Sequence, residues 1–366
     1  MGRLGISIYP EKSILEEMKN YIDLATDNGF DRIFTCLLSV NVENKSEIVE
    51  KFRNINNYAA SKGMMVIVDV SPRVFNDLGI SYRELSFFKG IGAHGIRLDM
   101  GFTGNEESLM TFNKENLMIE VNMSNNTHYI NLIIDYLPNK ENLIGCHNFY
   151  PHDHSGLNYE HFLECSHNFK KHGLRTAAFV TSQNTDTFGP WPVTDGLPTL
   201  EMHRKLPIEI QAKHFIAMNG LINDIIISNC YPTEEEIIKL GNLRRDLVTF
   251  DINLASDIPE IEEKIVLEEL HFNRGDISDS FIRSTQPRVK YKGHDFKLFN
   301  SVDIKRGDVI IESSEYGHYS GELQIALKDM KNSGKTNVVG RIREEEIFLL
   351  DYIKPWQKFI FKRGIL

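Results

Sequence analysis

Short apolar runs alternate with amphipathic segments along the first two thirds of the chain. Runs such as LGISI and MMVIVDV are rich in β-branched residues and contain few polar ones, which is typical of parallel strands buried on both faces. Between them apolar residues recur at helical spacing, and Gly29, Gly63 and Gly173 stand where left-handed helix C-caps are expected. Eight strand–helix units fit into about 245 residues, the usual size of a (β/α)₈ barrel. We predict a TIM-type barrel, with a doubly wound open sheet as the alternative.

Local signals place individual elements of this barrel. The segment DRIFTCLLSV at 31–40 predicts a strand, and helices are expected over 12–28, 44–62 and about 200–219. A short helix is expected to open at Ser81, because SYRE has the Ser-x-x-Glu pattern of a capping box.

The pattern changes after Asp246. Strand-like segments joined by Gly, Asp and Asn turns replace the long amphipathic segments, and they include IVLEELHFN, FIRSTQPRVKY, HDFKLFN and EEEIFLLDYI. The sequence therefore predicts two domains, a barrel over 1–246 that carries the catalytic groups and a β-rich domain over 247–366.

Composition narrows the functional classes. The formal charge of −10 argues against binding duplex nucleic acid, which needs clustered Lys and Arg. Four scattered cysteines, without a Cys-x-x-Cys pair, indicate buried thiols in a reducing compartment. The N-terminus enters a strand without a basic-then-apolar leader, and no apolar run reaches the ~20 residues needed to cross a bilayer. We expect a cytoplasmic protein that does not bind a membrane.

Carboxylates at the ends of apolar strands are the main candidates for chemistry. Asp69, Asp99 and Glu120 lie in the third, fourth and fifth predicted strands. A carboxylate in such a strand is costly unless it faces a polar pocket, and the C-terminal ends of barrel strands form the active face. Two acids in one pocket can hold different protonation states, as glycoside hydrolysis requires. Capping a loop, or pairing with a neighbour such as Arg97, is the alternative role for each.

Other polar residues at this face are candidates for substrate binding. HNFYPHDHSG offers hydrogen-bonding groups and an aromatic face suited to a sugar, and the Pro- and Gly-bearing loop FGPWPVTDGLPTLEMHR enters a helix. His152, Asp153 and His154 support a metal site only weakly, and GIGAHG precedes a strand rather than a helix, so no metal or nucleotide cofactor is expected. The substrate-binding candidates are Tyr9, Asn122, His147, Asn148, Tyr150, Glu201 and His203.

The segment HFNRGDISDSFIRSTQPR of the second domain concentrates basic and hydroxyl side chains. Arginine and serine together suit a phosphate, because they supply bidentate charge and a hydroxyl donor. A ladder of ion pairs with Asp276 and Asp279 is the alternative. The phosphate-binding candidates are His271, Arg274, Arg283 and Ser284.

Seven segments in this order resemble one enzyme family. LGISIYP, VDVSP, RLDMGF, NFYP, GLPTLEMHR, HFNRGDISDSFIRST and YSGELQI are similar to the 6-phospho-N-acetylmuramidases, glycoside hydrolase family one hundred and seventy. The resemblance covers essentially the whole chain. It implies a TIM-type barrel with a cyclophilin-like β domain. It also implies cytoplasmic hydrolysis of the β-1,4 bond of N-acetylmuramic acid 6-phosphate–N-acetylglucosamine during cell-wall recycling.

The resemblance and the residues together suggest roles. Glu120 or Asp99 is expected to be the general acid, and Asp69 the second carboxylate or an orienting group for the substrate's 2-acetamido group. Arg274 and Arg283, with His271, are expected to hold the 6-phosphate. After NFYP this chain has HDHSG where an Arg-containing stretch is expected, so a related phospho-disaccharide is an alternative substrate. A homodimer is left open.

Two other classes compete with the glycosidase. A phospho-sugar isomerase or aldolase would need a Schiff-base lysine or metal ligands, and none of the predicted strand ends carries a lysine. A non-catalytic phospho-glycan sensor would bind the same ligand without turnover. Likeness of the second domain to cyclophilins would not by itself carry isomerase activity.

Overall fold

The chain divides into two compact units. The computed structural model describes residues 2–37, 45–192 and 195–364. One unit comprises Met1–Phe215 with Gly220–Asn242, and the other Ile216–Asn219 with Leu243–Leu366. Residues 38–40 of the strand predicted at 31–40, Asn44 of the following predicted helix, and 193–194 of the long loop lie outside the described residues.

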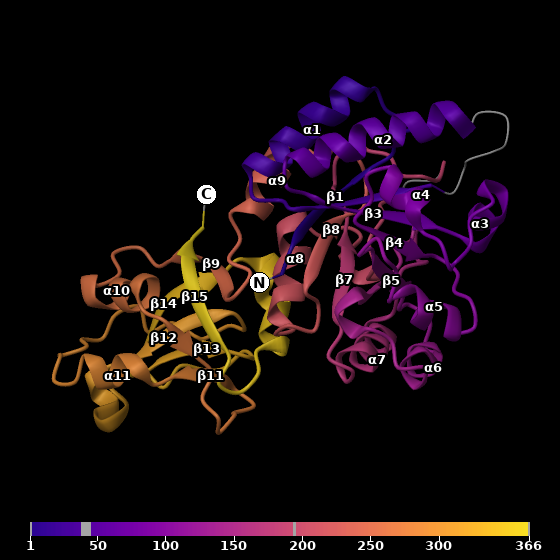
Figure 1. Ribbon diagram of the computed structural model, residues 1–366. Coiled ribbons are helices and arrows are strands. Elements are labelled where there is room, and N and C mark those ends of the chain that lie inside the picture. The colour runs from indigo at the N-terminus through magenta and orange to yellow at the C-terminus, as the bar shows by residue number, and fades with distance from the viewer. Residues whose placement is uncertain (1, 38–44, 193–194, 365–366) are drawn as a thin grey trace. The chain divides into compact units, whose positions relative to one another are not determined.

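The first unit is a closed barrel of eight parallel strands, which confirms the predicted TIM-type fold (Figure 1). Neighbours in the sequence are neighbours in the barrel, and β1 pairs with β8 to close it. The strands are buried almost throughout, as expected for a sheet covered on both faces. They are β1 (Leu4–Ile8), β2 (Arg32–Cys36), β3 (Met65–Val70), β4 (Gly95–Leu98), β5 (Met118–Asn122), β6 (Leu143–Cys146), β7 (Arg175–Val180) and β8 (Asp224–Ile227).

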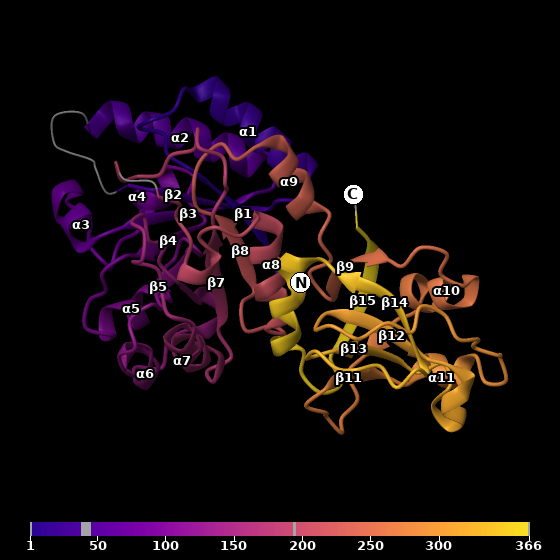
Figure 2. The same cartoon turned by 180° about the vertical axis from the view of Figure 1, so that it is seen from behind.

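Helices lie around the outside of these strands (Figures 1 and 2). In α1 the buried residues are Met18, Tyr21, Ile22 and Ala25, whose helical spacing presents one apolar stripe to the barrel. No described helix is both long and apolar enough to span a bilayer. The helices are α1 (Leu15–Asp27), α2 (Lys45–Ser61), α3 (Pro72–Leu78), α4 (Ser86–Gly90), α5 (Asn105–Met110), α6 (Tyr129–Asp135), α7 (Tyr159–Lys170), α8 (Ile208–Ala217) and α9 (Glu234–Gly241), with 3₁₀ turns η1 (Lys140–Asn142) and η2 (Glu201–His203).

Two predicted helix starts are wrong. The hydroxyl of Ser81 accepts a hydrogen bond from the amide of Arg83 within a tight turn, and Glu84 caps the amide of Ser86, where α4 begins. The helix predicted from about residue 200 is interrupted, because Pro207 has no amide hydrogen to donate to the preceding turn. Glu201 and His203 therefore lie in the short turn η2, ahead of α8.

The second unit is a mixed, nearly closed β barrel. Its sheet has the strand order β10-β15-β9-β14-β12-β13-β11, and among the described residues the β15–β9 pair is parallel and the other pairs are antiparallel. The amide of Arg274, two residues after the edge strand β10, donates to the carbonyl of Arg283 in the other edge strand, β11, at 3.0 Å, which nearly closes the barrel. The strands are β9 (Val248–Leu254), β10 (His271–Phe272), β11 (Phe281–Ser284), β12 (Asp308–Glu312), β13 (Leu323–Ala326), β14 (Thr336–Ile342) and β15 (Lys358–Arg363).

Four segments predicted as strands differ in the structure. IVLEELHFN begins in α10 (Glu260–Glu268) and reaches β10, and FIRSTQPRVKY continues from β11 into α11 (Gln286–Lys290). EEEIFLLDYI forms the 3₁₀ segment η4 (Glu344–Tyr352), and HDFKLFN has no regular structure. Acidic residues fill the first turns of α10 and η4, where they favour a helix start. A further 3₁₀ turn, η3 (Ser314–Tyr319), precedes β13.

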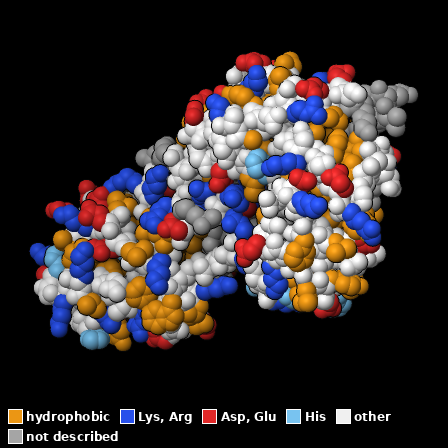
Figure 3. All heavy atoms as spheres, viewed as in Figure 1, with side chains coloured by type: hydrophobic (Ala, Val, Ile, Leu, Met, Phe, Trp, Pro, Cys, Tyr) orange, Lys and Arg blue, Asp and Glu red, His pale blue; other side chains and the backbone are white. Residues whose placement is uncertain are grey.

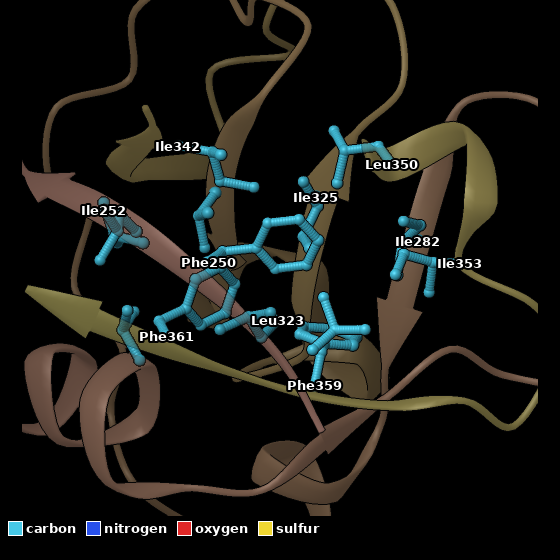
Figure 4. Packing of buried hydrophobic residues seen from close by; sticks show 14 of the residues in the cluster. Phe250, Ile252, Ile282, Leu323, Ile325, Ile342, Leu350, Ile353, Phe359 and Phe361 are labelled. Atoms are coloured by element: carbon cyan, nitrogen blue, oxygen red, sulfur yellow. The ribbon is translucent and has the colours of Figure 1, made fainter. Parts of the chain in front are cut away.

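Phenylalanines and branched aliphatic residues form the core of the second unit (Figure 4). Phe250 of β9 and Phe359 and Phe361 of β15 pack with ring centroids 5.6–6.1 Å apart. On the face of the molecule shown in Figure 3, acidic and basic side chains are intermixed on both units.

Candidate active site

A cavity with two adjoining lobes opens at the C-terminal ends of the barrel strands. The lobes measure about 330 Å³ and 180 Å³, and four residues line both of them. All four lie at the C-terminal side of barrel strands, at the end of β2, just after β4 and in the loop after β7, so the cavity occupies the face where TIM-type barrels hold their active sites. The shared residues are Cys36, Asp99, Pro190 and Trp191.

Two carboxyl groups meet one arginine in the smaller lobe. Asp69 of β3 and Arg97 of β4 are register partners, and Asp99 is two residues beyond Arg97 on the same side of its strand. Nη1 of Arg97 lies 2.7 Å from Oδ1 of Asp69 and 3.4 Å from Oδ1 of Asp99. Its other terminal nitrogen, Nη2, donates to Oδ1 of Asn148, which follows β6. Asp69 and Asp99 therefore pair with Arg97, which was the alternative role suggested by the sequence, and they also line the cavity wall.

Burial separates the chemistry of the two acids. Asp69 is 4% exposed, whereas the Asp99 side chain is 38% exposed. Desolvation raises the pKa of Asp69 to about 7, with Arg97 opposing this shift and the charge of Asp99 adding to it. Burial lowers the pKa of Arg97, but its acidic neighbours, Asp69 first, raise it by more. The lobe thus contains a carboxyl group that can carry a proton near neutral pH, beside a permanent cation.

Glu120 does not line either lobe. It is the third of the five residues of β5, fully buried, and it forms an ion pair with Arg32, the first residue of β2. Arg32 also pairs with Asp224 at 2.8 Å, and Asp224 with Arg175 at 2.6 Å. The expectation that all three strand acids meet at the cavity is therefore corrected. Asp69 and Asp99 meet there, whereas Glu120 belongs to an ion network that includes the first residues of β2, β7 and β8.

The larger lobe contains two cations that the sequence reasoning did not single out. Lys12, which follows β1, donates from Nζ to the carbonyl of Gly189 at 2.8 Å. Arg73, in the first turn of α3, lies with its Nε 3.8 Å from Asp77, and its side chain is 69% exposed. Ser71 and Glu11 line the same lobe. These residues follow β1 and β3 directly in the sequence. That position could have identified them as candidates, because the segments after barrel strands carry functional residues.

Of the predicted substrate-binding residues, Tyr9 and Asn148 line the cavity. Tyr9 lines the larger lobe and donates its hydroxyl to the carbonyl of Ser228, and Asn148 lines the smaller lobe. Asn122 supports the wall from behind, since its amide donates to the carbonyl of Asp99 at 3.3 Å. Tyr150 is half-buried and does not line the lobes.

His147 and His203 are interior residues. The ring nitrogens of His147 lie 3.2 Å from the hydroxyl of Ser124 and 2.9 Å from that of Ser166, and burial lowers its pKa to about 3. His203 is fully buried beside His214, at 2.7 Å between ring nitrogens. Neither imidazole lines the described cavity, so neither is placed to contact a ligand bound there.

Glu201 organises the loop after β6. It accepts hydrogen bonds from the amides of His154 and Gly156 and forms an ion pair with Arg204 at 2.6 Å. Hydrogen bonding to Arg204 lowers its pKa to about 2. Among the described residues, no three His, Cys, Asp or Glu side chains, those of the HDH segment included, are grouped as metal ligands.

The predicted phosphate ligands of the second unit are engaged with one another and with acids. His271 and Ser284 are fully buried and lie 3.1 Å apart, and the other ring nitrogen of His271 contacts the carbonyl of Ile265. Arg274 and Arg283 both pair with Asp276, at 2.7 Å and 3.2 Å. This is the ion-pair arrangement that the sequence offered as the alternative to an anion site.

Comparisons with known proteins give the family. The family model described as 6-phospho-N-acetylmuramidase, N-terminal, matches residues 4–242, and the one described as 6-phospho-N-acetylmuramidase, C-terminal, matches residues 248–362. A solved structure of an uncharacterized B. cereus protein is 48% identical over 99% of both chains, with a TM-score of 0.90.

A second solved structure shows the same fold at lower identity. It is a conserved Enterococcus faecalis protein of unknown function, 24% identical over 99% of this chain and 96% of that chain, with a TM-score of 0.70. A comparison with curated proteins found no significant match. Because the two family models cover nearly all of the sequence, the chain belongs to the 6-phospho-N-acetylmuramidase family and is a glycosidase.

Proposed function

We propose that this protein hydrolyses the β-1,4 bond between N-acetylmuramic acid 6-phosphate and N-acetylglucosamine. The observation that carries the proposal is the pair of carboxyl groups, Asp69 and Asp99, held by Arg97 in the wall of the barrel cavity. Family membership supports a phospho-muramyl sugar as the substrate. The use of this reaction in recycling cell-wall fragments in the cytoplasm is part of the proposal.

Asp69 is the general acid in this proposal. A buried carboxyl group with a pKa of about 7 is protonated in a large fraction of molecules at neutral pH. It donates its proton to the glycosidic oxygen as the bond to the anomeric carbon breaks, so that N-acetylglucosamine leaves with a neutral hydroxyl. The resulting carboxylate stays paired with Arg97, and it then accepts a proton from the water that completes hydrolysis.

Asp99 stabilises the positive charge that develops at the anomeric carbon. Its nearest oxygen and that of Asp69 cannot be farther apart than the sum of their two distances to Arg97 Nη1, 2.7 Å and 3.4 Å. That sum is below the roughly 6.5–9.5 Å of inverting enzymes, which hold a water between their carboxyl groups. Direct attack by Asp99, or its orientation of the 2-acetamido group for attack, would each retain the anomeric configuration.

Release of free N-acetylglucosamine from the phosphorylated disaccharide tests the proposal. The wild-type protein should release it catalytically, while Asp69→Asn and Asp99→Asn should be slowed by orders of magnitude. Arg53→Ala, on α2 outside the cavity, is a matched control that should keep the wild-type rate. Tight binding without release would instead support the phospho-glycan sensor. Wild-type rates in both Asn variants would remove the mechanism.

A further inference from the structure

The two lobes of the barrel cavity differ in their charged groups. The smaller lobe holds Asp69 and Arg97, and the larger holds Lys12 and Arg73, while Asp99 belongs to both. The bond-breaking acids and the two additional cations therefore lie in adjoining parts of one cavity. A ligand that fills both lobes would place one end at the acids and the other between the cations.

The groups in the larger lobe suit a phosphate monoester. Lys12 supplies a compact ammonium charge, Arg73 a planar fork of donors, and Ser71 a hydroxyl. Glu11 and Asp99 also line this lobe, so a bound anion must lie nearer to the two cations than to these two carboxylates. On a chain of net charge −10, an anion needs such a local cluster.

The contacts of Lys12 and Arg73 differ from those of the arginines in the second unit. Lys12 donates a hydrogen bond to the neutral carbonyl of Gly189, at 2.8 Å. Arg73 pairs with Asp77 at 3.8 Å. Arg274 and Arg283 differ in that both lie within 3.2 Å of Asp276, and Arg288 lies 3.0 Å from the buried Glu322. An anion at those arginines would have to compete with carboxylates.

We propose that Lys12 and Arg73 bind the 6-phosphate of the substrate and so determine its selectivity for phosphorylated sugars. The inference rests on the proposed function and places phosphate recognition within the catalytic barrel. Trp191, 46% exposed and part of both lobes, provides an apolar face for the sugar ring between the phosphate and the scissile bond.

Charge and position can be separated by the choice of variants. Lys12→Gln keeps a donor for the carbonyl of Gly189 but removes the charge, and Lys12→Arg keeps the charge. Arg73→Gln removes the charge of the second cation. Arg274→Ala and Arg283→Ala test the alternative site in the second unit, and Lys19→Ala, on α1 outside the cavity, is the control for loss of a surface cation.

Two measurements are made on each full-length variant. The first is kcat/KM for the disaccharide with and without the 6-phosphate. The second is calorimetric affinity for N-acetylmuramic acid 6-phosphate and for N-acetylmuramic acid, which does not depend on turnover. We expect Lys12→Gln and Arg73→Gln each to lower kcat/KM for the phosphorylated substrate about tenfold or more, mainly through KM, and to weaken binding of the phosphorylated sugar similarly. The kcat/KM and affinity for the unphosphorylated compounds should change little. Lys12→Arg should retain most of the wild-type kcat/KM and affinity for the phosphorylated compounds.

The outcomes separate this inference from the proposed function. Turnover that remains phosphate-selective in Lys12→Gln and Arg73→Gln would overturn the inference and leave the function standing. Loss of selectivity only in Arg274→Ala or Arg283→Ala would assign the phosphate to the second unit. Selective binding that depends on Lys12 and Arg73, without turnover in the wild type, would support the phosphate site and reject the hydrolase.

Discussion

Oδ1 of Asp69 accepts a 2.7 Å hydrogen bond from Nη1 of Arg97, its register partner on the neighbouring strand. Both side chains are almost completely buried, so the pair lies in a poorly solvated part of the barrel where electrostatic effects are strong. Burial favours the protonated form of Asp69, and Arg97 favours the ionised form. Because these two effects oppose each other, the pKa of Asp69 is about 7, and its carboxyl group can both donate and accept a proton at the cavity.

The first prediction concerns the pH dependence of turnover. Since Asp69 must be protonated to act as the acid and its pKa is raised to about 7, kcat should fall as the pH rises through about 7. Asp69→Asn should lower kcat about 10²–10⁴-fold on the disaccharide and abolish this basic limb. On an aryl glycoside whose leaving group needs no proton, the same substitution should lower kcat much less. A wild-type profile that stays flat to pH 9 would contradict the assignment.

The second prediction concerns stereochemistry. The shared contact of Asp69 and Asp99 with one nitrogen of Arg97 keeps the two acids closer together than is typical of inverting enzymes, so the released N-acetylmuramic acid 6-phosphate should first appear as the β-anomer. Proton NMR of the anomeric signal during early turnover measures this directly. Initial formation of the α-anomer would show inversion and would exclude the proposed geometry.

The third prediction distinguishes Glu120 from the cavity acids. Glu120→Gln weakens the buried pair with Arg32, and removing one partner of such a pair costs about 3–5 kcal/mol of unfolding free energy. Turnover per folded molecule should stay within about tenfold of the wild type, far above that of Asp69→Asn. Urea unfolding and active-site-normalised kinetics give the two values. A stable protein with Glu120→Gln that has lost turnover would instead support the catalytic role first expected for Glu120.

The fourth prediction concerns the stability of the second unit in acid. Burial lowers the pKa of His271 to about 4, below its unfolded value of about 6.5. Between these values the unfolded chain binds more protons, so stability is complete above pH 6.5 and decreases as the pH falls through the window, by up to about 3 kcal/mol. His271→Gln should reduce this acid dependence, while His318→Gln, at an exposed position, should not. Urea unfolding at pH 7 and pH 5 measures the difference. Equal pH dependence in the wild type and His271→Gln would contradict it.

The pattern of apolar and polar residues along the chain was sufficient to predict much of the fold and part of the candidate site. Parallel strands buried on both faces leave an uninterrupted apolar signal, and the regular alternation with amphipathic helices left few architectures other than a barrel. Because the C-terminal ends of such strands meet at one face, Asp69, Asp99, Tyr9 and Asn148 could be expected near one another before their geometry was known. The second unit was less predictable, because short apolar segments such as those in α10 and η4 fit a strand or a helical turn equally well.

Tertiary structure alone decided which polar groups face the cavity and which neutralise one another inside the protein. Asp69 and Glu120 both follow apolar residues in a strand, but Asp69 is next to last in β3 and Glu120 is in the middle of β5, so their depths in the barrel differ. The partners of His271 and Arg283 depend on pairing between strands and on neighbouring turns, and the proximity of Lys12 to Arg73 depends on loops that follow different strands. Spacing along a chain gives the side of a strand on which a residue lies. The charged groups that surround this residue come from segments distant in sequence, and they are brought next to it only when the barrels close.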